Sequence, residues 1–295
     1  MKIKLIGFDS MGTRGMATVV DIEGFKIFID PGVSYAPRRY GLPPHPIELE
    51  VLEKHLETIH REITDSHIVV ISHYHRDHYL YRDGEEEYYR NKVLLIKDPV
   101  NNINHSQRIR AYVLLEKRNV KNLAKEVRIA DEQFYEFENI RIYFSKPLPH
   151  GPDNTRLGYV LATVLEYEDF RLLHASDVQG PISRQALEYI VSVNPTLLII
   201  SGPPTYFEGY KMDPQHIREG FTNLLKIVES LRERSTVVVD HHLLRDLNYY
   251  DKLRDIIEIA RLRNISVLTA AEYMGLDVRP LEAMRKQLWM RERNQ

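Results

Sequence analysis

The chain has 295 residues, a formal net charge of −2 and no cysteine. Its length suits one large domain or two small ones, and its near-neutral charge provides no global field toward nucleic acid or an anionic membrane. The lack of cysteine excludes disulfides, thiolate metal sites and cysteine nucleophiles, so any metal must be held by histidine and carboxylates.

The N-terminal half begins with strand patterns and then alternates helices and strands. The N-terminal stretch becomes polar too early to be a signal peptide, and no apolar run approaches the length of a membrane span. We therefore expect a cytoplasmic protein. Short β-branched runs predict strands, and apolar residues at helical spacing predict helices. The expected strands are Lys2–Phe8, Met16–Ile22, Phe25–Asp30, His67–Ser72, Leu94–Lys97, Glu126–Ile129, Phe134–Phe137 and Ile140–Phe144, and the expected helices are Pro46–Ile63 and Ile103–Lys117.

The second half shows similar patterns. A hairpin of Tyr159–Tyr167 and Phe170–Ala175 is followed by alternating helices and strands. The expected helices are Ser183–Ser192, Pro214–Arg234, Tyr249–Arg263 and Pro280–Arg293, and the expected strands are Thr196–Ser201, Thr236–Asp240 and Ser266–Thr269.

These patterns predict a fold of mixed class. The sequence has no low-complexity linker, repeat or break in composition, so residues 1–295 are expected to form a single domain with helix 280–293 as an extension. Two β-rich halves, each with helices to cover one sheet face, predict an α/β (α+β) protein built as a four-layer αββα sandwich. A doubly wound parallel sheet is disfavoured because hairpin-type pairs occur in both halves.

The most informative motif is SHYHRDHY, which follows the apolar run Ile68–Ile71. It places His73, His75, Asp77 and His78 in the order H-x-H-x-D-H. On an extended strand end, residues two apart point the same way, so the first two histidines can hold one ion together. A turn after them would aim the aspartate and the last histidine at a second position. The alternative is that the motif binds no metal and forms a polar connection from strand to loop, with its histidines facing solvent.

Four further expected strand ends carry residues that bind metals. Strand-end loops are where such a fold presents its chemistry, and a lone aspartate or histidine there would carry little weight. The residues are Asp30 ahead of Pro31–Gly32, His150 ahead of Gly151, Asp177 at the end of RLLHASD, and the pair His241 and His242 after TVVVD.

Taken in order, these residues resemble the five motifs of the metallo-β-lactamase superfamily. The motifs are an early aspartate, H-x-H-x-D-H, a histidine, an aspartate and a final histidine, and here they span residues 30 to about 242. The DHHLLRD ending and the extended chain after it are similar to an archaeal branch of that superfamily. For this branch the resemblance supplies a fold but no substrate.

The resemblance implies two divalent metal ions. One would be held by His73, His75 and His150 and the other by Asp77, His78 and His241, with Asp177 bridging them. Asp30 would orient the cluster by hydrogen bonds, as metal sites generally require. Zinc suits this ligand set best, with iron or manganese as alternatives. His241 is preferred as the last ligand because it directly follows the strand. His242 would then contact substrate or support a ligand.

Other residues are candidates for contacting substrate, although each also fits an ordinary loop or a capped surface helix. They lie in the loop after Asp30, at the start of the expected helix near residue 105, and at the tip of SGPPTY. Arginine near a helix N-terminus makes an anion site. The candidates are Arg38, Arg39, Tyr40, His105, Arg108, Arg110 and Tyr206.

The resemblance implies metal-assisted hydrolysis. Two ions sharing a water would supply hydroxide near neutral pH, and Asp77 would orient that water or take its proton. Phosphoester or phosphodiester cleavage is the first expectation because several arginines are available to pair with phosphate. Lactone, thioester or amide hydrolysis is the alternative. A small-molecule or nucleotide-type substrate is expected, and nucleic acid stays open as a less favoured alternative.

Three other classes are less well supported. Nucleases with a large insertion before the last motif do not fit, because Asp177 and His241 are 64 positions apart. Flavin-linked di-iron members typically carry glutamate where this chain has His75, and they need an appended flavin domain. A non-catalytic binding protein would be expected to lose ligands, and this chain has the full set. The sequence gives no oligomeric state.

Overall fold

The computed structural model describes residues 1–137 and 139–293, which form two compact units, each with its own sheet. The first unit comprises Met1–Val100, His105–Ile129 and the chain from Met274 onward. The second comprises Asn101–Asn104 and Ala130–Tyr273. The expectation of a single domain stays a prediction. No helix in the described part of the chain has the length and apolar character needed to cross a membrane.

The first unit contains a six-stranded sheet in the order β1-β2-β3-β4-β5-β6. Two antiparallel pairings at its start give way to three parallel ones. The two central parallel strands are buried almost throughout, which explains their continuous apolar runs. The strands are β1 (Lys2–Ile6), β2 (Ala17–Ile22), β3 (Phe25–Ile29), β4 (Ile68–Ile71), β5 (Val93–Ile96) and β6 (Glu126–Ile129).

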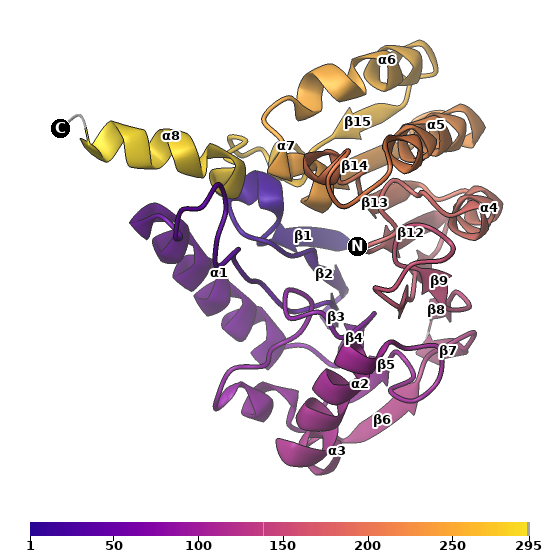
Figure 1. Cartoon of the computed structure of the whole chain (residues 1–295). Helices are drawn as coiled ribbons and strands as arrows, with labels where there is room; N and C mark the ends of the chain where they lie inside the picture. The colour runs from indigo at the N-terminus through magenta and orange to yellow at the C-terminus, as the bar shows by residue number, and fades with distance from the viewer. Residues whose placement is uncertain (138, 294–295) are drawn as a thin grey trace. The chain divides into compact units, whose positions relative to one another are not determined.

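Helix α1 (Pro46–Thr64) begins at a capping box, with His45 as the cap and Glu48 returning to its main chain. The C-terminal helix α8 (Leu281–Arg293) packs in the same unit as α1 (Figure 1). Its fully buried Arg285 forms a bidentate ion pair with Glu48, both bonds 2.7 Å long. Trp289 donates from Nε1 to the Pro43 carbonyl over 3.0 Å. The terminal helix therefore covers part of the first unit.

The remaining helices of this unit are short. The expected helix from Ile103 begins at His105 as α2 (His105–Tyr112) and continues as the π-helix η3 (Val113–Lys117). Three elements were not predicted: the 3-10 helices η1 (Asp9–Met11) and η2 (Glu85–Tyr89), and helix α3 (Val120–Leu123). Each is too short to show a helical period in the sequence.

The second unit contains a seven-stranded sheet in the order β15-β14-β13-β12-β11-β8-β7. From β7 toward β15 it has three antiparallel pairings followed by three parallel ones, whereas the first unit has two antiparallel pairings before its three parallel ones. Its strands are β7 (Phe134–Phe137), β8 (Ile140–Phe144), β11 (Thr163–Tyr167), β12 (Phe170–Ala175), β13 (Leu197–Ser201), β14 (Thr236–Asp240) and β15 (Ser266–Leu268).

The expected strand Tyr159–Tyr167 is interrupted. Its first two residues form β10 (Tyr159–Val160), which pairs with β9 (Leu148–Pro149) in a separate ribbon. The rest is β11 in the large sheet, where it pairs with β12 as the expected hairpin. The change of partner explains why one apolar run is divided between two sheets.

Helices cover one face of the second sheet (Figure 1). They are α4 (Arg184–Val193), α5 (Pro214–Ser230) and α6 (Tyr249–Leu262). The unit also contains the short α7 (Ala270–Tyr273) and the 3-10 helices η4 (Thr205–Phe207) and η5 (His241–Arg245). The prediction that α5 runs to Arg234 was wrong. Leu231 adopts an extended conformation and is buried, and its packing ends the helix despite the helix-forming residues that follow.

Two histidines of the first unit, His55 and His60, are half-buried. The Nδ1 atom of His55, on α1, lies 2.8 Å from the Thr13 hydroxyl, and burial lowers the pKa of His55 to about 4. His60 pairs with Glu85 at 3.1 Å and stacks on Tyr88. His55 is therefore neutral in the folded chain at pH 7.

The depressed pKa of His55 makes stability depend on pH. Below about pH 6.5 the unfolded chain takes up a proton at this ring, whereas the folded chain does not until about pH 4. The contribution of His55 to the free energy of unfolding is therefore fully present near pH 7. It falls by about 2 kcal/mol as the pH is lowered through this window. Urea unfolding of the wild type and of His55→Gln at pH 7 and pH 4.5 should show a smaller loss in the variant. An equal loss in both proteins would contradict this assignment.

Candidate metal-binding residues

In the first unit, the residues expected to bind or support metal gather around the buried carboxylate of Asp30. This residue directly follows β3, and its carboxylate accepts hydrogen bonds from the Ser72 amide at 2.8 Å and the Ser72 hydroxyl at 2.6 Å. Its Oδ2 also lies 3.1 Å from Nδ1 of His78. Asp30 is completely buried. Its hydrogen bonds connect the end of β3 to the turn that carries the histidine motif.

The same network orients His73. Since the one hydroxyl proton of Ser72 goes to Asp30, Nδ1 of His73, 2.9 Å from that hydroxyl, acts as the donor. The rings of His73 and His78 lie 4.3 Å apart, and those of His73 and His75 lie 4.7 Å apart. A hydrogen bond at Nδ1 directs the Nε2 lone pair of each of His73 and His78 toward a metal.

Asp77 and His75 are half-buried in the same turn. Oδ1 of Asp77 lies 3.9 Å from Nε2 of His78. Ligand-type atoms of Asp30, His73 and His78 all lie within 4.8 Å of one another. The structure therefore brings the motif residues together on one short turn beside the aspartate.

In the second unit the corresponding residues gather around Asp177. One carboxylate oxygen, Oδ2, lies 2.7 Å from Nε2 of His150, and the other, Oδ1, lies 3.2 Å from Nε2 of His241. All three residues are buried, and each follows a strand: β9, β12 and β14. The carboxylate thus faces a different histidine with each of its oxygens.

His242 is also close to Asp177 and His241, with ligand atoms within 4.8 Å. Burial and the neighbouring His241 lower the pKa of His242 well below its usual value, so its ring is neutral at pH 7. The ring stands edge-on to His241 at 4.4 Å and to His150 at 5.9 Å. The ion-pair geometry with Asp177 belongs to His241.

Strained backbone marks these strand ends. Asp30, Asp177 and His241 all adopt left-handed conformations, with φ of 50°, 54° and 58°. Gln179 does the same with φ of 58°. Such conformations cost about 1 kcal/mol or more for residues other than glycine, and they persist where the surrounding structure enforces them. The surrounding structure therefore holds these strand ends in their conformations.

Three supporting residues were not predicted from the sequence. They are Ser72, Gln179, whose amide nitrogen lies 3.2 Å from Nδ1 of His150, and Arg245, whose Nη2 lies 3.3 Å from both ring nitrogens of His241. The only sequence signal is proximity: each lies within four positions of a predicted ligand.

The predicted substrate residues lie in different places. Tyr206 accepts a hydrogen bond from Arg245 Nη1 at 2.9 Å, which connects it to His241. Arg38, His105 and Arg108 are exposed, and Arg108 donates to the Val100 carbonyl over 3.0 Å. Arg39 lies over the ring of Tyr40 and 4.0 Å from Glu282.

Two of the pockets on these units are lined in part by residues near the predicted ligands. One in the first unit, of about 450 Å³, is lined by residues of the histidine-motif turn and of α2. The other, of about 820 Å³ in the second unit, is lined by the loop after His150, by Gln179 and by the segment around α5. The first pocket has four arginines and one acid, whereas the second has two basic and three acidic side chains, leaving out His216.

Relatives with similar sequences identify the family. The chain is 41% identical to the UPF0282 protein MK0213 of Methanopyrus kandleri, over 98% of this chain and 99% of that protein. It is 43% identical to a UPF0282 protein of Aeropyrum pernix, over 99% of both chains. The chain belongs to the UPF0282 protein family. No family model matches it.

Solved structures similar to this UPF0282 protein confirm the predicted fold. The metallo-β-lactamase fold protein YhfI from Bacillus subtilis matches with a TM-score of 0.52 and 13% identity, over 91% of this chain and 96% of that one. Zn²⁺-bound PqqB from Methylobacterium extorquens matches with a TM-score of 0.50 and 10% identity, over 91% and 98%. CmlA, a diiron β-hydroxylase from Streptomyces venezuelae, matches with a TM-score of 0.54 and 12% identity, over 90% of this chain and 52% of that one. The UPF0282 chain has the metallo-β-lactamase fold.

Gly32 is required where the Asp30 loop meets the histidine motif. A Cβ at Gly32 would lie 2.2 Å from the Tyr79 amide nitrogen and 2.7 Å from that of His78, and backbone atoms cannot move away cheaply. We predict that Gly32→Ala destabilises the chain by about 3 kcal/mol in urea unfolding.

The matched control is Gly24→Ala. Gly24 has φ of 94° and no atom within 4 Å of a built Cβ, so only the backbone conformation is penalised, by about 1 kcal/mol. If both variants lost the same stability, the close approach at Gly32 would not matter.

Proposed function

We propose that this protein is a metal-dependent hydrolase that uses two divalent metal ions, with zinc as the first choice. The observation that carries the proposal is the carboxylate of Asp177, whose two oxygens face His150 and His241 separately at 2.7 Å and 3.2 Å. A carboxylate that serves two histidines through different oxygens is suited to bridging two ions. The resemblance of the motifs assigns His73, His75 and His150 to one ion and Asp77, His78 and His241 to the other.

The donor set fits such ions. Imidazole and carboxylate ligands suit zinc, iron and manganese, and the absence of cysteine leaves no thiolate to compete. The Nδ1 hydrogen bonds of His73 and His78 direct Nε2 as the ligand atom in both rings. Among similar folds, PqqB is described with Zn²⁺ and CmlA as diiron, so both metals suit the fold.

Gln179 supports the same role for His150. Its Oε1 is buried and has no hydrogen-bond partner among the described residues, while its Nε2 faces Nδ1 of His150. Oxygen and nitrogen of an amide are interchangeable by rotation, and the rotated amide accepts a proton from Nδ1. That tautomer presents Nε2 of His150 to a metal. Gly151 leaves space for this contact, since a Cβ there would lie 2.4 Å from Oε1.

When bound, the two ions supply a water activated for hydrolysis near neutral pH. The chain's own residues then orient the reactants. Asp77 carries a half-buried carboxylate on the motif turn, suited to orienting the water or taking its proton. Asp30 holds the turn, and the guanidinium of Arg245 lies against His241 and reaches Tyr206. Tyr206 and Arg245 would contact the substrate or keep His241 in place.

A phosphoester or phosphodiester is the substrate class we favour. Phosphate needs cations beyond the metals, and the pocket of the first unit has three more basic than acidic side chains. The pocket in the second unit has an excess of one acidic side chain, which would suit a neutral lactone, thioester or amide. A panel of these substrate classes distinguishes the two functions.

Loss of a ligand should abolish metal binding and hydrolysis together. We predict that His73→Ala and Asp177→Ala bind fewer than two metal equivalents by elemental analysis. Their hydrolysis of bis(p-nitrophenyl) phosphate should fall by at least about 100-fold, because even residues that support a ligand contribute 10- to 100-fold. Far-UV circular dichroism should stay unchanged. The wild type should turn over this diester faster than lactone or thioester substrates.

Asp169→Ala is the matched control, because Asp169 is exposed in the same unit on the turn between β11 and β12. It should keep its metal and its activity. Full activity of either ligand variant after chelation, with no metal added back, would rule out the dinuclear mechanism. Faster turnover of a lactone or thioester would rule out the phosphoester assignment alone.

A further inference from the structure

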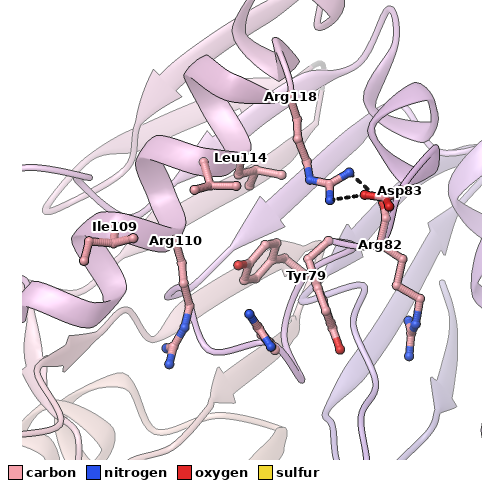
Figure 2. A pocket seen from close by; sticks show the side chains of 10 residues that line it. Tyr79, Arg82, Asp83, Ile109, Arg110, Leu114 and Arg118 are labelled. Atoms are coloured by element: carbon pink, nitrogen blue, oxygen red, sulfur yellow. Dashed lines mark hydrogen bonds and ion pairs between the residues drawn. The ribbon is translucent and has the colours of Figure 1, made fainter.

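The pocket of the first unit contains a group of arginines beside the histidine motif. Its cavity has a volume of about 450 Å³. Arg76, which stands between His75 and Asp77 in the motif, lines one part of it. Figure 2 shows Arg110 extending from α2 beside the ring of Tyr79, and Arg118 joined to Asp83. The pocket is thus lined by residues of the motif turn, of α2 and of its π-helical continuation η3.

The four arginines are not equally neutralised. Arg118 pairs with Asp83 at 2.6 Å and with Glu86 at 3.0 Å, and Arg82 pairs with Glu85 at 3.3 Å. In contrast, neither Arg76 nor Arg110 has a carboxylate partner within the described residues. Two guanidinium groups therefore face the pocket without a compensating acid.

The contacts of these two arginines leave donors available. Arg110 donates from Nη1 to the Tyr74 carbonyl over 3.1 Å, which holds its position without cancelling its charge. Arg76 lies over the ring of Tyr81, 5.2 Å from its centroid. A guanidinium has five N–H donors in a planar fork, so each arginine retains donors for an anion.

The other walls are apolar or aromatic. Ile109 and Val113 are 49% and 39% exposed, and Leu114 is buried beside them. Tyr79 is also buried, and its aromatic side chain forms part of the wall. An inorganic anion would use the arginines but not these walls. The pocket is suited to an anion attached to an apolar or aromatic body.

We propose that this pocket binds the acidic group of an organic ligand, a phosphate or a carboxylate, through Arg76 and Arg110, while Tyr79, Ile109 and Val113 contact its apolar body. The proposal rests on the proposed function in one respect only. It takes the ligand to be the substrate of the hydrolase, and the reacting bond of that substrate is cleaved outside this pocket. The arginines would then select substrates that carry an anionic group. Arginine suits this task because it pairs with two oxygens at once and stays charged at any working pH.

The experiment is calorimetric titration of the full-length protein with phenyl phosphate, phenylacetate and phenol, with metal present and after chelation. Under both conditions we expect the two anions to bind and phenol to bind at least about tenfold more weakly, because it lacks the charge-assisted hydrogen bonds. The tighter of the two anions identifies the acidic group.

Variants connect this binding to the pocket. Arg110→Gln and Arg76→Gln should each weaken phenyl phosphate binding by about tenfold or more, while Arg110→Lys, which keeps the charge, should recover part of the loss. Arg90→Gln is the matched control, since Arg90 is exposed in the same unit and pairs with Glu87 outside the pocket. Its affinity should equal that of the wild type.

The results distinguish this proposal from the proposed function. Unchanged affinity in both glutamine variants, or anion binding that disappears on chelation, would overturn the pocket assignment. Asp177→Ala should lose hydrolysis yet keep its affinity for phenyl phosphate in the chelated state. If metal-dependent hydrolysis were absent from the wild type while the arginine variants lost anion binding, the proposed function would fail and the pocket would remain.

Discussion

The buried carboxylate of Asp30 is the interaction on which the geometry of the histidine motif depends. A charged carboxylate without solvent is costly, and here it is stabilised by hydrogen bonds from the Ser72 amide, the Ser72 hydroxyl and His78. Those bonds hold the first turn after β4 and set the donor atoms of His73 and His78. Gly32 lets the two segments approach closely enough for the network to form. A packing constraint and a chemical constraint therefore act on the same few residues.

The second unit uses a carboxylate in a different way. Asp177 is also buried, left-handed and placed directly after a strand, but its oxygens face two histidines. The oxygens of Asp30 accept hydrogen bonds from the Ser72 amide, the Ser72 hydroxyl and the His78 imidazole, which suits a supporting residue. Asp177 directs its oxygens at Nε2 atoms, which suits a bridging ligand. The difference in partners explains why two aspartates at similar positions in the topology are assigned different roles.

Much of the fold could be predicted from the sequence because its strands and long helices have strong periodic patterns. The parallel strands β4 and β13 are continuous apolar runs, and α1 starts at a proline after a capping residue. The short elements could not be predicted, since α3 and η5 contain about one helical turn and their formation depends on packing. The division of residues 159–167 between two sheets likewise depends on long-range pairing.

The candidate site was predictable to a different degree. Its expected ligands follow strands and stand in an ordered motif, so the sequence could propose them, and their binding of metal stays a prediction. Gln179 and Arg245 could not be proposed, because they act through side-chain contacts that no spacing encodes. Arginines in NNINHSQRIR were recognised, but the sequence did not show that Arg110 lines a pocket while Arg108 bonds the Val100 carbonyl. Helical phase alone cannot reveal which arginine faces a cavity, because the pocket is formed by a second segment, the turn carrying Arg76 and Tyr79.

The central claim is that two metal ions share one carboxylate. Electron paramagnetic resonance of the metal-free protein titrated with Mn²⁺ tests it most directly, because ions in bridged sites lie roughly 3.5–4 Å apart and couple magnetically. The account predicts saturation at two equivalents with the spectrum of an exchange-coupled pair, which Asp177→Asn should lose. Saturation at one equivalent, or a sum of isolated six-line Mn²⁺ signals in the wild type, would contradict it.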